Sequence, residues 1–259
     1  MSGLQFVETP AGRIEYRWAG SVLRDTSRPV LVFLHEGLGC VALWKDFPDQ
    51  VAQATGLPAL VYSRIGYGGS SACALPRPIT YMHDEGETGL PDLLTALGIQ
   101  SHILIGHSDG ASIALIYAGK DRDGLKGVAV MAPHVFCEDI SVRSIRAADK
   151  AYAEGDLKAR LAKYHGDNVD CAFRGWCDSW LNPDFHHWNI EAYVDRIKVP
   201  VLVIQGEDDE YGTAAQVESI WRRAGAETLL VPGCGHSPQR DQPAVTLTAL
   251  AGFIHSLEL

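Results

Sequence analysis

Apolar residues gather in short runs that are separated by longer amphipathic stretches. Strands buried on both faces of a parallel sheet contain nearly continuous apolar runs of this length. Such runs lie at residues 30–35, 59–63, 102–106, 127–132, 201–206 and 227–231. Before them, residues 4–8 and 13–18 alternate apolar and polar positions on either side of a turn at 9–12, which predicts an antiparallel hairpin. The chain therefore predicts a mostly parallel, eight-stranded sheet.

The longer stretches predict helices that flank this sheet. Residues 81–97 place leucines close to a 3.6-residue period and stop at Gly98, as a helix does. Further helical stretches lie at 112–117, 213–224 and 245–257. Alternation of strands and helices along a chain is typical of the α/β class.

One interval interrupts the alternation. Between residues 134 and 199 no run predicts a strand, and polar helical stretches surround a tract rich in aromatic residues. The tract contains Phe173, Trp176, Trp180, Phe185 and Trp188. We therefore expect a helical cap inserted after the sixth strand. The predicted domains are a first core part at 1–133, the cap at 134–199 and a second core part at 200–259.

Composition narrows the class of partner. The 259 residues carry a formal net charge of −10 at pH 7, and no cluster of Lys and Arg forms the basic stripe of a nucleic-acid-binding protein. The acidity also mildly disfavours a polyanionic substrate. Six cysteines show no CxxC pair or dense framework, which predicts free thiols in a reducing compartment. They are Cys40, Cys73, Cys137, Cys171, Cys177 and Cys234.

The start of the chain lacks the basic and apolar regions of a signal peptide. No apolar run approaches the roughly 18 residues that a membrane span requires. We therefore expect a soluble, cytoplasmic protein whose partner is a small-molecule substrate, with no nucleic acid and no membrane. A homodimer stays open.

The strongest chemical signal is Gly106-His107-Ser108-Asp109-Gly110, a G-x-S-x-G pattern. It follows the apolar run at 102–106 and precedes the helical stretch at 112–117. A sharp strand-to-helix turn projects the serine hydroxyl from the sheet edge, and small residues on both sides let strand and helix pack closely. In this context we identify Ser108 as a nucleophile, against the alternative of a serine that only caps the helix.

A serine hydroxyl requires a base within hydrogen-bond reach and an acid that orients the base. In this architecture the acid and then the histidine follow the serine along the chain. His236 follows the run at 227–231 and is the predicted base. Asp208 and Asp209 follow the run at 201–206 and are both candidates for the acid. An acid elsewhere, Glu138 or Asp139, is a third alternative.

The remaining histidines are less well placed for catalysis. His35 and His134 follow strands and could line a substrate site, whereas His107 lies inside the motif and should point away from the reacting atom. His186 and His187 lack the helical spacing of a metal-binding pair, and we assign them to surface or packing. We predict no metal and no cofactor.

Strands, turns and residue order resemble the α/β-hydrolase superfamily, in its serine-nucleophile esterase-like branch, over nearly the whole chain. The resemblance implies the α/β-hydrolase fold. Gly-x-x-Asp often ends the corresponding strand in that superfamily, which maps Gly206 onto Asp209 and makes Asp209 the preferred acid. Residues 62–70 likewise resemble the superfamily's loop Asp-x-Arg-Gly-x-Gly-x-Ser, which we interpret as a mark of the fold.

The same resemblance implies an oxyanion hole, whose donors often make the greatest single contribution to acyl-transfer catalysis. One donor would be the backbone amide of Asp109. The other would be the amide of Gly37, or with less support Leu38, in the loop after the third strand. This chain departs from the superfamily at Glu36, where glycine is usual. The Glu36 carboxylate either faces solvent or receives a substrate amine or hydroxyl.

The leading hypothesis is a hydrolase of small or medium carboxylic esters or thioesters, acting through an acyl-enzyme on Ser108. Trp176 and Trp180 stand four residues apart and would form a cap core, a wall of the acyl pocket, or both. Lactonase, carbon–carbon bond hydrolase and proline-releasing aminopeptidase are alternatives with the same triad. A small-molecule receptor with slow hydrolysis is an alternative of another class.

Overall fold

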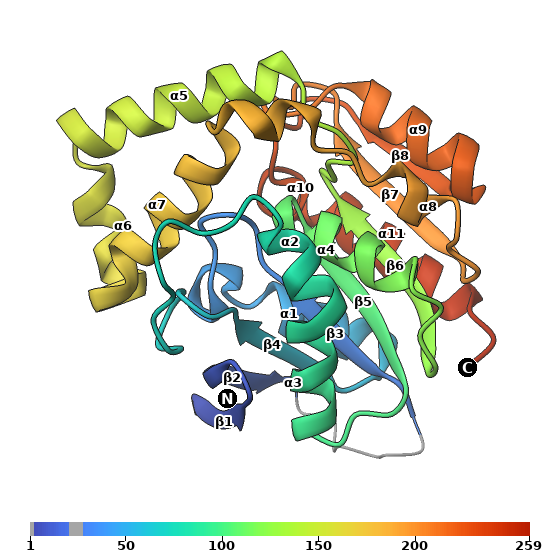
Figure 1. The fold of residues 1–259 in the computed structure, drawn as a ribbon. Helices are drawn as coiled ribbons and strands as arrows, with labels where there is room; N and C mark the ends of the chain where they lie inside the picture. Colours follow the sequence, from blue (N-terminus) through green and yellow to red (C-terminus); the bar gives the residue numbers. More distant parts are fainter. Residues whose placement is uncertain (1–2, 21–27) are drawn as a thin grey trace.

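The computed structural model describes residues 3–20 and 28–259 (Figure 1). Residues 1–2 and 21–27 lie outside the described part. The first two belong to the start of the chain that the signal-peptide prediction concerns. The strands form an eight-stranded sheet in the order β1-β2-β4-β3-β5-β6-β7-β8. Their bounds are β1 Gln5–Thr9, β2 Gly12–Ala19, β3 Val30–Leu34, β4 Ala59–Ser63, β5 His102–His107, β6 Leu125–Met131, β7 Val201–Gly206 and β8 Glu227–Val231.

The strand directions confirm the predicted mostly parallel sheet. β1 pairs antiparallel with β2, and β2 pairs antiparallel with β4. Every later pair of neighbours, from β4–β3 to β7–β8, is parallel. Because parallel strands end at one edge of a sheet, the loops that follow β3, β5, β7 and β8 meet there. That edge positions the candidate site.

The apolar runs of the sequence follow from burial on both faces of the sheet. In β3, Val32 and Leu34 belong to one core cluster, whereas Leu31 and Phe33 belong to the other. All four side chains are fully buried. Side chains alternate between the faces of a strand, so a strand covered on both sides is apolar at every position.

Helices cover the two faces unequally (Figure 1). One face packs against α1 and α11, whose Val51 and Phe253 share a cluster with Phe33. The other packs against α2, α3, α4, α8 (Glu191–Val194) and α9. Ile113 of α4 and Ile220 of α9 share a cluster with Val32. The helices of the core are α1 Phe47–Thr55, α2 Tyr81–Asp84, α3 Leu90–Ala96, α4 Asp109–Ala118, α9 Ala214–Ala224, α10 Pro238–Asp241 and α11 Pro243–Ser256, with a 3₁₀ turn at Val41–Trp44.

The helix predicted at 81–97 contains a wide turn. A π-helical segment, Glu85–Gly89, joins α2 to α3, and Gly98 follows with φ 63°. Leu90 and Leu93 are buried, as their spacing predicts. The leucines that carry the predicted period all follow the π segment, so their spacing gives no sign of it.

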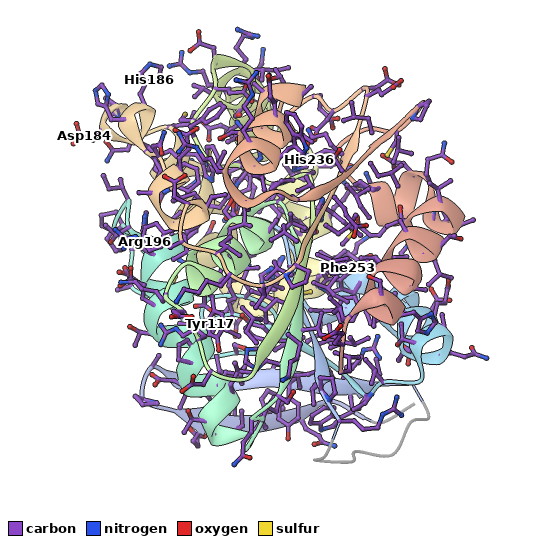
Figure 2. The ribbon with its side chains drawn as sticks, turned by 90° about the vertical axis from the view of Figure 1, so that its right-hand side faces the viewer. Tyr117, Asp184, His186, Arg196, His236 and Phe253 are labelled. Atoms are coloured by element: carbon purple, nitrogen blue, oxygen red, sulfur yellow. The ribbon has the colours of Figure 1, made fainter. Side chains whose placement is uncertain are left out.

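Between β6 and β7 the chain is helical, with an isolated bridge between Phe136 and Asn189. The helices are α5 Asp139–Glu154, α6 Leu157–His165, α7 Val169–Trp180 and α8 Glu191–Val194, with 3₁₀ turns at Gly166–Asn168 and Pro183–His187. Helices α5 to α7 lie at the top and upper left of Figure 1, away from the C-terminus. The aromatic tract is buried. His186 is exposed and lies far from His236 (Figure 2). The cap limits at 134–199 stay a prediction.

Candidate active site

Ser108 lies at the turn between β5 and α4. Its φ of 52° and ψ of −117° fall in a region that side-chain-bearing residues rarely adopt. The flanking glycines permit the turn. A Cβ on Gly106 would lie 2.4 Å from the Gly110 carbonyl oxygen, and one on Gly110 would lie 2.2 Å from the Leu34 carbonyl oxygen. The backbone strain is therefore held at the residue that the motif singles out.

Three side chains from separate strand ends form one hydrogen-bonded line. His236 Nε2 lies 2.8 Å from Ser108 Oγ. On the other side of the ring, His236 Nδ1 lies 2.8 Å from Asp209 Oδ1 and 3.0 Å from Oδ2. The serine follows β5, the aspartate β7 and the histidine β8. An ionised carboxylate only accepts, so Nδ1 donates and Nε2 is left to accept the serine proton.

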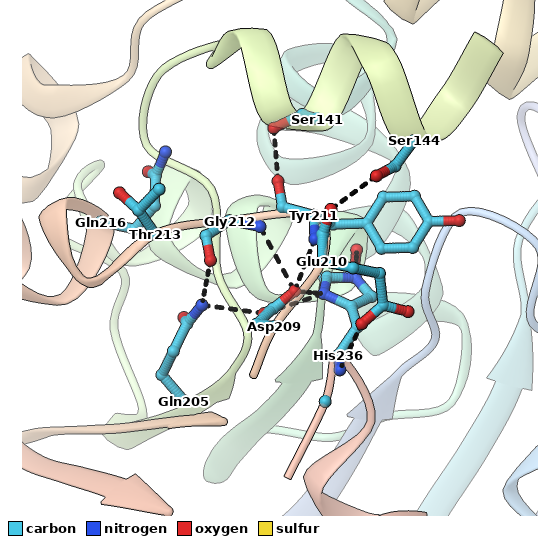
Figure 3. A network of polar contacts seen from close by, with 12 residues as sticks. Ser141, Ser144, Gln205, Asp209, Glu210, Tyr211, Gly212, Thr213, Gln216 and His236 are labelled. Atoms are coloured by element: carbon cyan, nitrogen blue, oxygen red, sulfur yellow. Dashed lines mark hydrogen bonds and ion pairs between the residues drawn. The ribbon is translucent and has the colours of Figure 1, made fainter. Parts of the chain in front are cut away.

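The Asp209 carboxylate is held by several donors (Figure 3). Oδ1 accepts the backbone amides of Tyr211 at 2.8 Å and Gly212 at 3.3 Å, and Oδ2 accepts Gln205 Nε2 at 2.8 Å. Burial opposes ionisation, but the hydrogen bonds from His236 and Tyr211 outweigh it and lower the pKa of Asp209. The carboxylate is thus charged and fixed toward His236.

The other candidate acids lie elsewhere. Asp208 is exposed at the turn after β7. Glu138 accepts hydrogen bonds from the backbone and hydroxyl of Thr213 and from Gln216, at the start of α9. Asp139 is the first residue of α5. Of these candidate acids, the structure brings Asp209 to His236.

Two serines of α5 tie this helix to the acid-bearing turn (Figure 3). Ser141 Oγ donates to the Tyr211 carbonyl and Ser144 Oγ donates to the Glu210 carbonyl, each at 2.5 Å. The first helix after β6 therefore contacts the segment that carries Asp209.

The predicted oxyanion donors lie beside the serine. Asp109 is the first residue of α4, and the first amides of a helix have no acceptor within it. Gly37 and Leu38 line the same cavity as Ser108. A Cβ on Gly37 would lie 2.3 Å from the Trp176 ring, so a residue without a side chain is required beneath that indole.

Buried Arg64 holds the loop that contains Gly37. Its guanidinium donates to the His35 carbonyl and, at 3.2 Å, to the Glu36 carbonyl. Its backbone amide donates to His35 Nε2 at 3.1 Å. Arg64 belongs to the segment at 62–70, which the sequence marks as typical of the fold. In the structure this arginine also shapes the loop opposite Ser108.

The Asp109 side chain lies in a buried polar cluster. It is fully buried and accepts Tyr81 OH at 2.5 Å and Trp180 Nε1 at 3.3 Å, and Arg64 Nη2 lies 4.0 Å away. Burial raises the pKa of Asp109, while Arg64 and these hydrogen bonds act in the opposite direction. The cluster joins the α4 turn, the loop after β4 and helix α7.

His107 and His134 line the cavity, and His35 and His107 support its loops. His134 lines the cavity, 5.7 Å from the His236 ring, and burial lowers its pKa to about 3. The prediction that His35 lines a substrate site is wrong. Its side chain is fully buried, because Nδ1 is bonded to the Glu36 carbonyl and Nε2 to Arg64. His107 Nε2 donates to the His236 carbonyl at 2.7 Å and so supports that loop.

A cavity of about 240 Å³ opens on Ser108. Its Glu36 carboxylate is 29% exposed and lies 3.5 Å from His107 Nδ1. Burial opposes ionisation of Glu36, but His107 outweighs it and lowers the pKa of that carboxyl. The lining residues are Glu36, Gly37, Leu38, His107, Ser108, Asp109, His134, Ser141, Ile145, Trp176, Trp180, Glu210, Tyr211, His236, Ser237 and Arg240.

Sequence reasoning missed several residues that hold the site. Gln205, Arg64 and Tyr81 contact the predicted residues but belong to no motif for that role. A polar glutamine inside the apolar run at 201–206 is the one signal that could have been noticed, because buried polar groups require partners.

Within residues 3–20 and 28–259, no helix is long and apolar enough to cross a membrane. The same residues contain no group of three or more His, Cys, Asp or Glu placed to hold a metal ion.

The fold and the hydrogen-bonded line of serine, histidine and aspartate define an α/β protein with a hydrolase-like site. Residues 31–249 match the Alpha/beta hydrolase family, and the chain belongs to this family. Its sequence is similar to a human (Lyso)-N-acylphosphatidylethanolamine lipase, at 33% identity over 85% of this chain and 78% of the relative.

Two bacterial relatives carry other activities in their names. A 2-succinyl-6-hydroxy-2,4-cyclohexadiene-1-carboxylate synthase of Klebsiella pneumoniae is 26% identical over 88% of this chain and 94% of its own. A proline iminopeptidase of Lactobacillus delbrueckii subsp. lactis is 32% identical over 82% of this chain and 85% of its own. The fold is similar to that of a Pseudomonas aeruginosa hydrolase, with a TM-score of 0.75, 20% identity and 98% and 99% of the two chains covered.

Proposed function

We propose that this protein is a serine hydrolase that cleaves small or medium carboxylic esters or thioesters through an acyl-enzyme on Ser108. The observation that carries the proposal is the line from Ser108 Oγ through His236 to Asp209, at the wall of a cavity of about 240 Å³. A nucleophile, a base with a defined tautomer and a charged acid are the parts that acyl transfer requires.

In acylation, His236 Nε2 takes the hydroxyl proton as Ser108 Oγ attacks the carbonyl carbon. The resulting imidazolium is stabilised by the Asp209 carboxylate. The amides of Asp109 and Gly37 bind the oxyanion, and His236 then gives its proton to the departing alcohol or thiol. Water attacks the acyl-enzyme with His236 again as base, and Ser108 regains its proton when the acid leaves.

The cavity supports a small acyl group. Its volume lies below the range of about 300–1,000 Å³ that is usual for drug-sized ligands. Leu38, Ile145, Trp176 and Trp180 give it apolar walls. A neighbouring cavity of about 400 Å³ shares Glu36 with it, so a leaving group that passes Glu36 has room beyond.

Charge argues against an anionic ligand such as the carboxylate that the Klebsiella synthase is named for making. Glu36 and Glu210 both line the described cavity, and Arg240 is its only lining Lys or Arg. A carboxylate placed among like charges loses more in repulsion than it gains from one exposed guanidinium.

Glu36 favours a second candidate, hydrolysis of an ester or amide that carries an amine. The human lipase and the proline iminopeptidase are both over 30% identical to this chain but are named for different reactions. These relatives therefore do not decide between ester and amide hydrolysis. Lactone and carbon–carbon bond hydrolysis use the same triad and remain alternatives, as does a slow receptor. We also propose that the protein acts on a small-molecule substrate and is located in the cytoplasm.

Steady-state turnover on matched ester, thioester, lactone and amide panels tests the proposal, with Ser108→Ala as the reference. We expect many turnovers on short-chain esters or thioesters and a loss of several orders of magnitude in kcat in the variant. A single turnover per chain would support a receptor instead. Wild-type rates in Ser108→Ala would refute the mechanism.

A further inference from the structure

Two cysteines far apart in sequence face each other beside the active-site helix α7. Cys73 belongs to the loop after β4, and Cys171 is the third residue of α7. The Cys171 thiol donates to the Cys73 carbonyl at 3.4 Å, and the Cys73 thiol lies 3.9 Å from the Cys171 carbonyl. Both residues are half-buried, so small molecules can reach them.

The surrounding contacts hold the two segments together in the reduced protein. Arg77 Nε donates to Cys73 Sγ at 3.2 Å. A Cβ on Gly175, one turn after Cys171 on the same face of α7, would lie 2.6 Å from Arg77 Nε. Asn168 Nδ2, just before α7, donates to the Ser70 carbonyl at 2.7 Å. These contacts, together with the two thiol–carbonyl contacts, keep Cys73 and Cys171 side by side.

We propose that Cys73 and Cys171 form an oxidisable thiol pair that reacts with a small-molecule disulfide, such as glutathione disulfide, and closes to an intramolecular disulfide. This inference does not rest on the proposed hydrolase function.

The chemistry is thiol–disulfide exchange. One cysteine thiolate attacks a sulfur of glutathione disulfide, and one glutathione thiolate leaves. The second cysteine thiolate then attacks the sulfur of the first, and the other glutathione leaves. The two protein thiols are oxidised and the oxidant is reduced to two glutathione thiols. Arg77 Nε donates to Cys73 Sγ, so we expect Cys73 to be the first nucleophile.

The consequence would fall on the cavity wall. Helix α7 carries Trp176, whose ring covers Gly37, and Trp180, whose Nε1 contacts Asp109. A bond from Cys171 to Cys73 ties the start of this helix to the core across 98 residues of chain. A covalent link across a loop of this length stabilises the folded state strongly, and it restricts the motion of α7.

The test equilibrates the intact protein in glutathione buffers of increasing oxidising power, traps free thiols by alkylation and measures the mass. We expect the wild type to lose two alkylation sites together and to yield a cross-linked peptide pair containing Cys73 and Cys171. We also expect its Tm to rise by roughly 5–15 °C. In Cys73→Ser and Cys171→Ser, the remaining cysteine of the pair should stay a free thiol or carry a glutathione adduct. The Tm of these variants should not rise in oxidising buffer.

Cys137→Ser is the matched control, because Cys137 is also half-buried but lies just before α5. It should oxidise like the wild type. Full alkylation of Cys73 and Cys171 at every ratio of reduced to oxidised glutathione would overturn the proposal. Stable glutathione adducts on both residues, or a disulfide to another cysteine, would overturn it as well. Reduced variants that keep the wild-type Tm show that the loss of the link is not a loss of the fold.

Discussion

The two sides of the Ser108 cavity are built differently. On the side of the proposed acid and base, Asp209 and His236 sit on short turns after β7 and β8, and donors within four residues hold Asp209. On the side of the proposed oxyanion hole, Asp109 and the loop at Gly37 are held by side chains from distant segments. The Asp209 carboxylate is therefore held mainly by its own turn, although Ser141, Ser144 and His107 support that side from distant segments. The other side depends on tertiary packing throughout.

This difference also predicts how each side fails. A substitution on the acid–base side removes a group that acts on the reacting proton, so its effect should be large and confined to chemistry. A substitution on the oxyanion side shifts a backbone donor through an intermediary, so its effect should be smaller. It should also depend on how well the substituted side chain keeps the buried contacts.

The largest expected effect separates the two aspartates of the β7 turn. Asp209→Asn leaves His236 with the wrong tautomer, and we expect kcat to fall about 10³–10⁴-fold. Asp208→Asn is the matched control, because Asp208 is exposed one residue earlier, and its kcat should change less than about twofold. Steady-state kinetics on one short-chain ester measures both. A larger loss at Asp208 would reverse the assignment of the acid.

A smaller effect probes the oxyanion side through α7. Trp180 Nε1 donates to Asp109 and to Tyr81 OH, at 3.3 and 3.0 Å, so Trp180→Phe leaves a buried carboxyl with one donor fewer. We expect kcat to fall roughly 2–10-fold with KM nearly unchanged, since a hydrogen bond contributes about 0.5–1.5 kcal/mol net. Steady-state kinetics with an ester and the matching thionoester measures this, because oxyanion donors act weakly on sulfur.

Trp188→Phe is the control for that substitution. Trp188 is buried in the same aromatic tract, but its Nε1 has no hydrogen-bond partner among the described residues. Its replacement should leave kcat within about twofold. Equal losses in the two variants would show that packing of the tract, and not the contact with Asp109, supports the donor.

A specificity effect is expected at Glu36, where the chain departs from its superfamily. The carboxylate lines both cavities, so it should favour substrates with an amine near the scissile bond. Glu36→Gln should reduce kcat/KM for an amine-bearing ester roughly fivefold, because an ion pair that solvent still reaches contributes about 1 kcal/mol. The kcat/KM of the neutral analogue should change little. The ratio of the two specificity constants measures the effect. If this ratio does not change, Glu36 contributes only to the structure of its loop and not to substrate recognition.

His134 lies between the two sides, against both Trp180 and His236. Burial lowers its pKa to about 3, below the unfolded value of about 6.5. The unfolded state therefore binds the extra proton first, and stability is lost as pH falls from about 6.5 toward 3. Between pH 7.5 and 4.5, the wild type should lose about 2–3 kcal/mol more unfolding free energy than His134→Gln.

Urea unfolding at both pH values measures that difference. His134→Gln keeps the backbone contacts of residue 134 with Ser112, so the variant should fold. Parallel pH curves for the two proteins would mean that His134 does not titrate between these limits.

The sheet could be predicted from sequence because its cause is local. Every position of β3 or β7 faces a core, and this burial leaves apolar runs whose limits match the strands to within two residues. The strand-to-helix turn was also predictable from Gly106 and Gly110. A Cβ at either position would lie about 2–3 Å from backbone atoms, so only glycine fits there.

The oxyanion side was not predictable in the same way. Nothing near Arg64 in sequence shows that its guanidinium reaches the His35 carbonyl, and nothing near Asp109 shows its contact with Trp180, 71 residues away. Such contacts depend on how α7 packs, which a periodic pattern does not specify. For the same reason His35 looked accessible after its strand, although the structure buries it.

Active-site labelling tests the central claim most directly. A fluorophosphonate should form one covalent adduct per chain, mapped by mass spectrometry to Ser108, and His236→Ala should slow the labelling by several orders of magnitude. A stoichiometric adduct on another residue, or labelling of the His236 variant at the wild-type rate, would contradict the account.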